Sequence, residues 1–550
     1  MSVAPRPEVA MLRLYLALAT CFALFPALAF AQPPAPVRMC AEWEPVEGVM
    51  IRWPLGISTA LVRELAEDDT LYVIILSSQI ASATSTFTAA GVNLAHVQWV
   101  VADSWSHWSR DWGPQCLFDG AGNWGILDPW FDGYPWIPRE ATGYEQDDDT
   151  PAQFAAYLGG EPLWQPPFYL TGGNIMYDGH GRAFCSEAQV SENDHLSEAA
   201  FRAAVASWCG VSELVVLPNT ESYGIQHIDC VAKFLDEETV IVKQLYPGHQ
   251  NAPYVEQNAQ ILAGLTSCYG NPLRVVRVHC GPFPNVGMAA YTNALILGKK
   301  VLVPILNCEG DAPALQAYRD AMPGYEVLGF TGSWYNYDAL HCRTMGIFDR
   351  GMLRVDLAPP PAEIPAADWP VTAFVDDRSD AGLDLAGCAL HWRLAGATDF
   401  ASVPLLPLAG DSLRAWLPAQ APSAEIEYYL EAADLSGRVE RRPIAAPAAL
   451  YRTAVAPDLT AVETLPAAPI LAAWPRPFRE RLELAAASRG AAVEVAIYDS
   501  TGRCVRRLAL ANGRGSWDGR DTGGRELPAG VYLLRAASGG GAPLKALKLR

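Results

Sequence analysis

The chain has 550 residues, of which half are hydrophobic and 18% are charged, so the composition excludes a wholly disordered protein. This length exceeds what one hydrophobic core organises, and several domains are therefore expected. Sixty acidic residues against forty basic ones give a net charge of −20, which argues against non-specific nucleic-acid binding because phosphate contact needs a basic surface.

The first 31 residues have the pattern of a secretory signal peptide. Arg6 and Arg13 precede an apolar run, and small residues at Ala29 and Ala31 form a typical cleavage site. We therefore predict a signal peptide over residues 1–31 and a secreted or cell-surface protein. An uncleaved membrane anchor is the alternative, because the apolar run is almost long enough to span a bilayer.

Residues 39–355 alternate short apolar segments with amphipathic ones. Strands are predicted at 49–53, 71–76, 97–101, 213–217, 239–242, 274–278 and 300–303, and helices at 59–68, 197–207, 254–265 and 312–321. This alternation predicts an α/β domain. Periodicity alone leaves open whether its sheets form one barrel, a doubly wound sheet or a propeller.

Two β-rich regions follow, each after a stretch rich in proline and alanine. Residues 367–452 are predicted to form an Ig-like β-sandwich with strands at 371–375, 389–394, 412–417 and 425–431. In the region 470–550, strands at 493–499 and 504–508 are predicted to form a hairpin, and 531–535 another strand. The sequence thus predicts one α/β domain followed by two small all-β domains.

Four residues of the first domain are of the types needed to hydrolyse a guanidinium group. Asp111 and Asp229 can hold this planar cation by charge-assisted hydrogen bonds. Cys342 can attack its central carbon, and His227 can move the protons. In a strand over residues 224–230, His227 and Asp229 would project from the same face. Spacing alone does not pair the four, because a single cysteine is more often a small buried hydrophobe.

The cysteines predict a free thiol and no metal centre. Twelve are present, and Cys21 lies in the predicted signal peptide, so at least one of the remaining eleven stays unpaired within a monomer. No CxxC pair and no compact Cys/His cluster occurs at metal-ligand spacing. We therefore predict neither a metal ion nor another cofactor for the chemistry.

Five short segments resemble, in the right order, the motifs of the agmatine deiminase and bacterial peptidylarginine deiminase family. They are 41–49 (AEWEPVEGV), 108–114 (WSRDWGP), 171–175 (TGGNI), 227–229 (HID) and 339–344 (ALHCRT). The resemblance implies a pentein fold, in which ββαβ-like units form a five-bladed α/β propeller around a central site. It also implies Cys342 as the nucleophile and His227 as the general acid and base. Asp111 and Asp229 would be the guanidinium ligands.

Two further residues are candidates for binding the substrate. The resemblance implies that Trp108 packs on the aliphatic stem of the substrate. From the residue type alone, an ordinary tryptophan of the hydrophobic core is an equally good interpretation. Asn293 is a candidate for positioning the substrate near the nucleophile, and the alternative is a polar residue at the end of a strand.

The segment 336–344 resembles the exported peptidylarginine deiminases more than the cytosolic agmatine deiminases, which have a glycine-rich lead into the cysteine. This predicts deimination of arginine in peptides or proteins to citrulline with release of ammonia. An Arg-Pro-Arg element known from the exported branch is absent, since Arg139 is the only basic residue in 130–139. A deiminase of agmatine or free arginine, and a non-catalytic surface adhesion protein, are the alternatives.

The C-terminal region resembles a FlgD-type Ig-like domain. The similarity lies in segments 474–478, 497–503, 517–521 and 528–532. Such domains often serve as sorting signals for type IX secretion, so the resemblance implies the secretion machinery as a partner. A plain β-sandwich spacer is the alternative, because fold and function separate easily.

Overall fold

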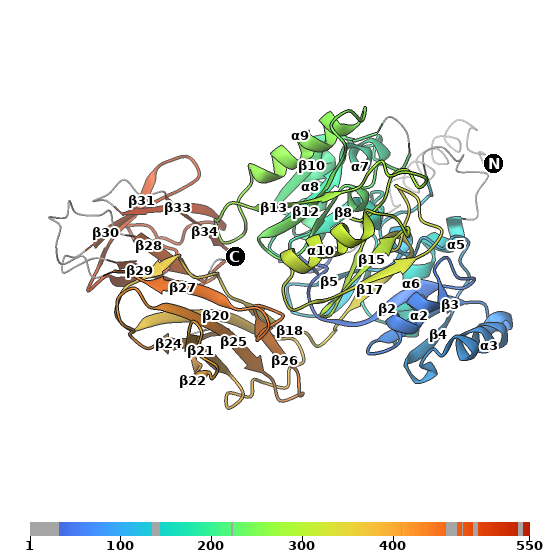
Figure 1. Cartoon of the computed structure of the whole chain (residues 1–550). Helices are drawn as coiled ribbons and strands as arrows, with labels where there is room; N and C mark the ends of the chain where they lie inside the picture. The colour runs from blue at the N-terminus through green and yellow to red at the C-terminus, as the bar shows by residue number, and fades with distance from the viewer. Residues whose placement is uncertain are drawn as a thin grey trace, which may run out of the picture.

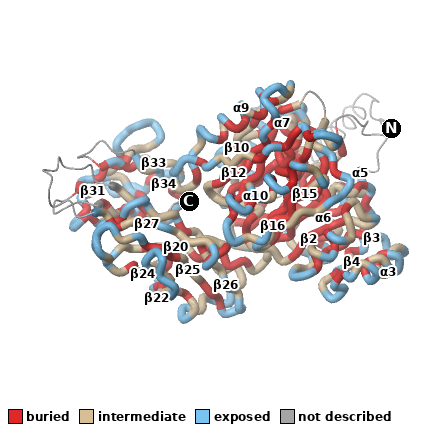
Figure 2. Tube along the Cα trace, viewed as in Figure 1, coloured by how far each residue is buried: buried red, intermediate tan, exposed pale blue. Residues whose placement is uncertain are grey.

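The computed structural model describes residues 32–134, 144–221, 224–408, 410–457, 470–475, 477–487, 493–536 and 543–550, and the predicted signal peptide lies outside them. The chain forms an α/β unit, drawn in blue to yellow, and two β units in orange and red (Figure 1). Buried residues concentrate in the interior of the α/β unit (Figure 2). No helix in the described part of the chain is long and apolar enough to cross a membrane.

Five separate sheets with one common strand order build the α/β unit, and none of them closes on itself. The first contains β1 (Arg38–Met39), β5 (Gln115–Phe118), β6 (Trp124–Leu127) and β7 (Leu163–Trp164). The second contains β8 (Ile175–Tyr177), β9 (Arg182–Ser186) and β10 (Glu213–Leu217), and the third β11 (Ala232–Phe234), β12 (Thr239–Gln244) and β13 (Arg274–His279). The fourth contains β14 (Leu295–Leu297), β15 (Lys300–Ile305) and β16 (Glu326–Thr331). The fifth contains β17 (Met345–Phe348), β2 (Val46–Arg52), β3 (Thr70–Ile75) and β4 (Val97–Val101).

In each sheet an antiparallel pair of strands is followed by a third strand parallel to the second. Helices make the crossover to the parallel strand, as parallel pairing requires. They are α2 (Thr59–Leu65), α5 (Tyr144–Asp148), α6 (Thr150–Tyr157), α7 (Glu187–Glu192), α8 (Glu198–Cys209), α9 (Ala252–Ala263) and α10 (Asp311–Ala321), and α3 (Ile80–Ala90) connects β3 to β4. The fifth sheet joins both ends of this region, because β17 pairs with β2.

The predicted strands and helices of this region are confirmed, with small shifts at their ends. β4 and β10 have the predicted bounds. The helix α8 begins where the side chain of Ser197 accepts a hydrogen bond from the Ala200 backbone N–H, and it ends at Gly210, whose φ is 67°. Both are standard helix-end signals, since serine caps the first free N–H groups and glycine adopts the left-handed conformation at low cost.

The second unit consists of two sheets that share one hydrophobic core. One contains β18 (Leu353–Asp356), β20 (Trp369–Asp377), β24 (Ser412–Leu417) and β23 (Leu406–Pro407). The other contains β19 (Glu363–Ile364), β27 (Tyr451–Val455), β25 (Glu425–Ala433), β21 (Ala389–Leu394) and β22 (Ala401–Pro404), with β26 (Val439–Arg442) beside β25. β18 belongs to the predicted α/β domain but pairs with β20, so these two regions are joined by a strand ladder.

The third unit also has two sheets, which pack around the buried ring of Trp517. One contains β28 (Ile470–Trp474), β29 (Leu482–Ala487) and β32 (Arg514–Trp517). The other contains β31 (Cys504–Leu510), β30 (Val493–Tyr498), β33 (Gly530–Ala536) and β34 (Leu544–Lys548). The predicted hairpin is confirmed, since β30 and β31 are antiparallel neighbours.

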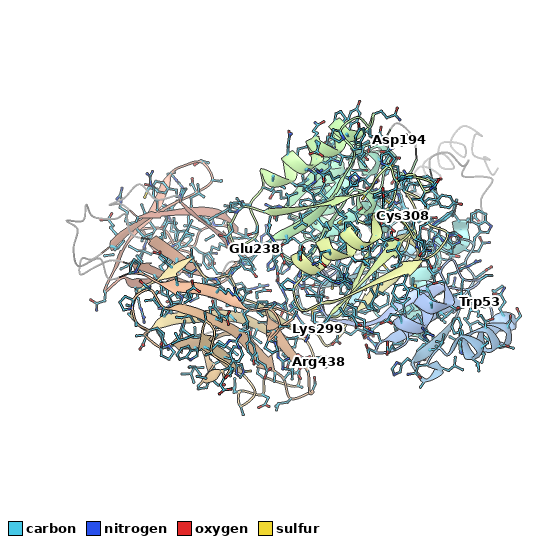
Figure 3. All side chains as sticks on the ribbon, viewed as in Figure 1. Trp53, Asp194, Glu238, Lys299, Cys308 and Arg438 are labelled. Atoms are coloured by element: carbon cyan, nitrogen blue, oxygen red, sulfur yellow. The ribbon has the colours of Figure 1, made fainter. Side chains whose placement is uncertain are left out.

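Charged side chains tie the second unit to the α/β unit. Arg438, labelled in Figure 3, binds both carboxylate oxygens of Asp349 at 2.6 and 2.7 Å. This fork-to-fork arrangement fixes orientation as well as distance.

Candidate active site

Four of the six predicted site residues lie in turns that each come just before one strand of an antiparallel pair. Trp108 and His227 immediately precede two of these turns. The turns are α4 (Ser109–Trp112) before β5, η4 (Gly172–Asn174) before β8, η5 (Ile228–Cys230) before β11, residues 290–294 before β14, and η6 (His341–Arg343) before β17. Because the sheets share one strand order, these five turns are equivalent positions of a repeated unit.

Hydrogen bonds connect each of these turns to the next and the last to the first. The Gly173 N–H donates to Asp111 Oδ1 at 3.2 Å, and the Ile228 N–H to Asn174 Oδ1 at 3.1 Å. Further bonds run from Asn293 Nδ2 to Cys230 Sγ, from the His341 N–H to Asn293 Oδ1, and from Arg110 Nε to the Thr344 carbonyl. The turns therefore form a ring of contacts around one centre.

The segment around His227 and Asp229 is not the predicted strand. His227 is the extended residue before the short helix η5, and Gln226 has a φ of 56°, which interrupts an extended chain. The side chain of Asn174 accepts a hydrogen bond from the Ile228 backbone N–H, so this N–H cannot pair with a neighbouring strand. The helical turn, and not strand alternation, brings His227 and Asp229 to the same site.

The two aspartates and His227 surround a single point in front of Gly173. A Cβ atom on Gly173 would lie 2.5 Å from Asp111 Oδ1, 2.9 Å from His227 Nδ1 and 3.2 Å from Asp229 Oδ2. Asp111 is held in place by the Gly173 N–H and by the Tyr134 hydroxyl, which donates to its Oδ2 at 2.5 Å. Two buried carboxylates facing one small space suit a planar cation.

Cys342 lies beside this point. Its Sγ is 3.7 Å from Asp229 Oδ2 and accepts a hydrogen bond from Asn293 Nδ2 at 3.2 Å. Asn293 Oδ1 also accepts the Cys342 N–H, so the asparagine fixes both the backbone and the sulfur. Burial, together with the neighbouring Cys230 and Asp229, raises the pKa of the Cys342 thiol well above its usual range. Without a bound cation the sulfur is therefore a thiol.

His227 is buried among acidic groups. Burial alone would lower its pKa, but the charge of Asp111, followed by Asp229 and Glu192, raises the pKa of His227 to about 9. Nδ1 lies 3.4 Å from Asp111 Oδ1, outside hydrogen-bond geometry. At neutral pH the ring is therefore an imidazolium that can donate a proton.

A relay of three charged side chains, His341, Glu42 and Lys233, supports Asp229. His341 Nδ1 lies 2.7 Å from Asp229 Oδ2, and His341 Nε2 lies 2.9 Å from Glu42 Oε2. Lys233 Nζ in turn donates to Glu42 Oε2 at 2.7 Å. Carboxylates only accept, so both ring nitrogens of His341 donate. Burial alone would raise the pKa of Asp229. The hydrogen bond from His341 and its charge outweigh this effect, so the pKa is lowered and the carboxylate stays charged.

Sequence reasoning missed His341, Glu42 and Lys233 as functional residues. A signal for two of them was present, because Glu42 lies in the first quoted motif and His341 directly precedes Cys342. Lys233 lies in β11 and carries no local motif.

Replacing His341 by glutamine is expected to lower kcat/KM by about 10- to 100-fold, the range seen when a residue supporting a functional ligand is lost. Without the imidazolium the pKa of Asp229 rises, so the acidic limb of the kcat/KM–pH profile should move to higher pH. Steady-state kinetics across pH test this, with His195→Gln on the exposed surface as the control. An unmoved acidic limb would show that His341 does not set the charge of Asp229.

Trp108 lies next to Asp111 and is half-buried. Its ring meets the Tyr134 ring edge-on, with centroids 5.2 Å apart, and it packs against a hydrophobic cluster of the α/β unit. This position is compatible with contact to a substrate stem and with a core role. The predicted substrate contact therefore stays a prediction.

Two small cavities adjoin the site. One of about 10 Å³ is lined by His227 and Cys230 together with Glu221, Lys243 and Tyr337. The other, of about 40 Å³, lies behind the relay and is lined by residues that include Glu42, Arg110 and His341. The first is the candidate entrance, because its lining reaches from the reacting groups to the half-exposed Tyr337.

One group in the described ranges has the composition of a metal site. Asp229, Cys230 and Cys342 offer ligand atoms that all lie within 4.8 Å of one another. The sequence did not indicate this group because its members come from η5 and η6, more than a hundred positions apart.

Comparison with known proteins agrees with this geometry. The model of the Porphyromonas-type peptidyl-arginine deiminase family matches residues 38–347, and that of the FlgD Ig-like domain matches residues 479–541. A provisionally named agmatine deiminase of Vibrio parahaemolyticus is 24% identical over 330 residues, which are 52% of this chain and 89% of the relative.

Solved structures show the same fold for the α/β unit. The agmatine deiminase of Enterococcus faecalis is 20% identical with a TM-score of 0.50, over 58% of this chain and 98% of the other. A provisionally named arginine deiminase of Porphyromonas gingivalis is 22% identical with a TM-score of 0.50, over 58% of this chain and 100% of the other. The α/β unit thus has the pentein-type deiminase fold, followed by all-β regions.

Proposed function

The chain belongs to the Porphyromonas-type peptidyl-arginine deiminase family, and from this premise we propose that it deiminates arginine in peptides or proteins to citrulline and ammonia. One observation carries the proposal. Asp111, Asp229 and His227 surround the point in front of Gly173, and Asp229 Oδ2 is within 3.7 Å of Cys342 Sγ. A guanidinium placed there would meet two carboxylates, an imidazolium and a thiol.

The proposed reaction begins when the substrate cation offsets the negative charge of Asp111 and Asp229, so that the Cys342 thiol releases its proton to the solvent and becomes a thiolate. The thiolate attacks the guanidinium carbon and forms a tetrahedral adduct. His227 gives its proton to one nitrogen, which leaves as ammonia while a covalent thiouronium remains on the sulfur. Neutral His227 then takes a proton from water, and the hydroxide attacks the same carbon. The C–S bond of this second adduct breaks as its hydroxyl proton passes to the ammonia, so that citrulline, ammonium and the thiolate are released.

The raised pKa of His227 predicts a basic limit to activity. Because the Cys342 thiol must lose its proton while His227 keeps its own, kcat/KM should rise with pH and level off above roughly pH 9, where loss of the imidazolium offsets the gain in thiolate. Arginine keeps its charge over this range. Glu192→Gln removes one of the carboxylates that raise this pKa, so kcat/KM should level off at a lower pH. A rate that still rises above pH 9 would contradict the role of His227.

Two observations bear on the proposed substrate class, namely the names of the relatives and the lining of the entrance. Agmatine carries a second positive charge in place of the peptide backbone, and curated relatives bear the name agmatine deiminase. The entrance, however, is lined by the ammonium of Lys243 as well as the carboxylate of Glu221. This mixed lining gives no preference for a second cation and is compatible with a neutral backbone. Arg139, the one basic residue of 130–139, lies outside the described residues.

The test compares kcat/KM for matched peptides with internal or C-terminal arginine, for free arginine and for agmatine. Turnover of at least one arginine peptide supports the proposal, and exclusive turnover of agmatine overturns it. If the protein acts on none of these guanidine compounds, the alternative of a non-catalytic surface adhesion protein is favoured.

We also propose that the five sheets are the blades of a propeller around this site. The shared strand order and the ring of hydrogen bonds between the five turns support this arrangement. The predicted central position of the site would follow directly from it.

Export is a further part of the proposal. The pattern of residues 1–31 supports cleavage after Ala31, and the FlgD Ig-like match supports recognition of the C-terminal region by type IX machinery. N-terminal sequencing of the protein from the cells that produce it would test the cleavage. A retained residue 1 would contradict it.

A further inference from the structure

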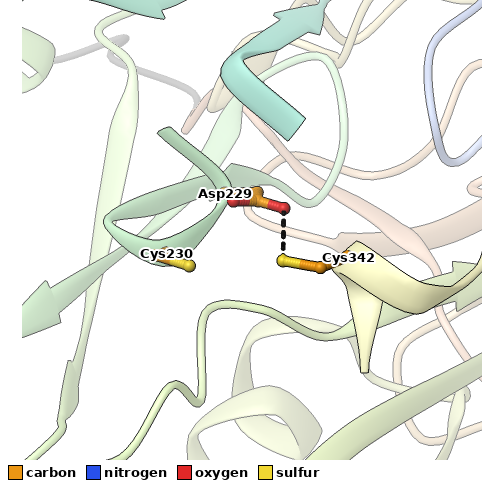
Figure 4. Close-up of side chains that lie close together, drawn as sticks. All are labelled: Asp229, Cys230 and Cys342. Atoms are coloured by element: carbon orange, nitrogen blue, oxygen red, sulfur yellow. Dashed lines mark hydrogen bonds between the residues drawn. The ribbon is translucent and has the colours of Figure 1, made fainter. Parts of the chain in front are cut away.

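The sulfur atoms of Cys230 and Cys342 and a carboxylate oxygen of Asp229 form a compact, buried group. All three ligand atoms lie within 4.8 Å of one another (Figure 4). It is the single group of at least three such residues in the part of the chain that the structure describes. Cys230 has no part in the proposed deimination.

We propose that this group binds a thiophilic divalent cation, with Zn²⁺ as the type case, and that the bound ion switches the enzyme off. Thiolates and a carboxylate are ligands that zinc accepts in tetrahedral sites, with Zn–S near 2.3 Å and Zn–O near 2.0–2.2 Å. Such bond lengths place the ligand atoms somewhat under 4 Å apart, and the distance from Cys342 Sγ to Asp229 Oδ2 is already 3.7 Å. Three protein ligands leave the fourth position to water.

The surroundings of the group support metal binding independently of its composition. Asp229 Oδ1 is buried without a hydrogen-bond partner, which leaves it able to bind an ion. Asp229 Oδ2 is oriented by His341 Nδ1. The amide nitrogen of Asn293 has two N–H bonds and donates one to Cys342 Sγ at 3.2 Å and one to Cys230 Sγ at 3.4 Å. Outer partners of this kind orient metal ligands and stabilise their charge.

Binding converts both thiols to thiolates and releases two protons to the solvent. Two thiolates and one carboxylate on a dication leave a net charge of −1, beside the imidazolium of His341. Because Cys342 Sγ cannot be both a zinc ligand and the nucleophile, the ion and the guanidine substrate exclude each other. Inhibition is therefore competitive with the substrate, and chelators restore activity.

Direct metal binding to the full-length protein tests this without relying on catalysis. Co²⁺ serves as the spectroscopic probe, and Zn²⁺ affinity is measured against a chromogenic chelator. We expect one high-affinity ion per chain and a thiolate-to-cobalt absorption band. Cys230→Ser should weaken Zn²⁺ binding by at least about 100-fold, the upper range for loss of an outer partner. Cys504→Ser, which removes an exposed thiol, should not change the affinity.

Inhibition is measured in parallel, with each variant scaled to its own metal-free rate. Cys230→Ser and Cys230→Ala should both need far more Zn²⁺ for half inhibition than the unmodified protein. Equal sensitivity of these variants would overturn the proposal, because zinc would then bind Cys342 alone. Loss of activity on chelation would overturn it as well, since the metal would be a cofactor. A protein inactive on every guanidine still leaves the cobalt and chelator measurements decisive.

Discussion

Replacing Cys342 by alanine is expected to lower kcat on arginine peptides by at least about 10⁴-fold, the scale seen when a nucleophile is removed from a covalent mechanism. Asp111, Asp229 and His227 remain in place, but none of them can form the thiouronium intermediate. Citrulline formation and ammonia release, measured together, report the loss.

The controls for this variant separate chemistry from folding. Cys185→Ala removes another buried thiol, which packs in a hydrophobic cluster that does not contain Cys342, and it should keep most of the activity. Thermal unfolding should show that Cys342→Ala is folded, and substrate binding should persist because both carboxylates are present. Turnover by Cys342→Ala at the rate of the parent would remove this cysteine from the mechanism.

Much of the fold could be predicted because strands buried on both faces are continuous apolar runs. The strands β3 and β15 illustrate this, since five of the six residues of β3 and four of the six residues of β15 are buried. The strand order that the five sheets share could not be predicted from the sequence in the same way. The segments that connect the parallel strands differ widely in length, so the repeat has no constant spacing in the sequence. The fifth sheet is built from both ends of the region, and its register, with Met345 opposite Met50, needs the folded chain.

The site could be predicted only in part. The ordered motifs identified Cys342 and Asp229, and Asn293 was a separate candidate; the structure brings these three residues together. The residues that hold them could not be found by spacing, because Glu42 and His341 are 299 positions apart and touch only after packing. The same holds for Cys230, which directly follows the motif 227–229 and becomes a candidate metal ligand only because the fold places it beside the sulfur of Cys342.

Replacing Gly173 by alanine is expected to lower kcat/KM by at least about 100-fold, the scale reported for a misplacement of about 1 Å at a reacting centre. The added methyl group would lie 2.5 Å from Asp111 Oδ1 and 2.9 Å from His227 Nδ1, and would therefore fill the space proposed for the guanidinium. Gly346→Ala is the matched control, because its nearest atom would be Val46 Cγ1 at 3.9 Å. If kinetics of the folded Gly173→Ala protein match those of Gly346→Ala, the substrate does not bind at this point.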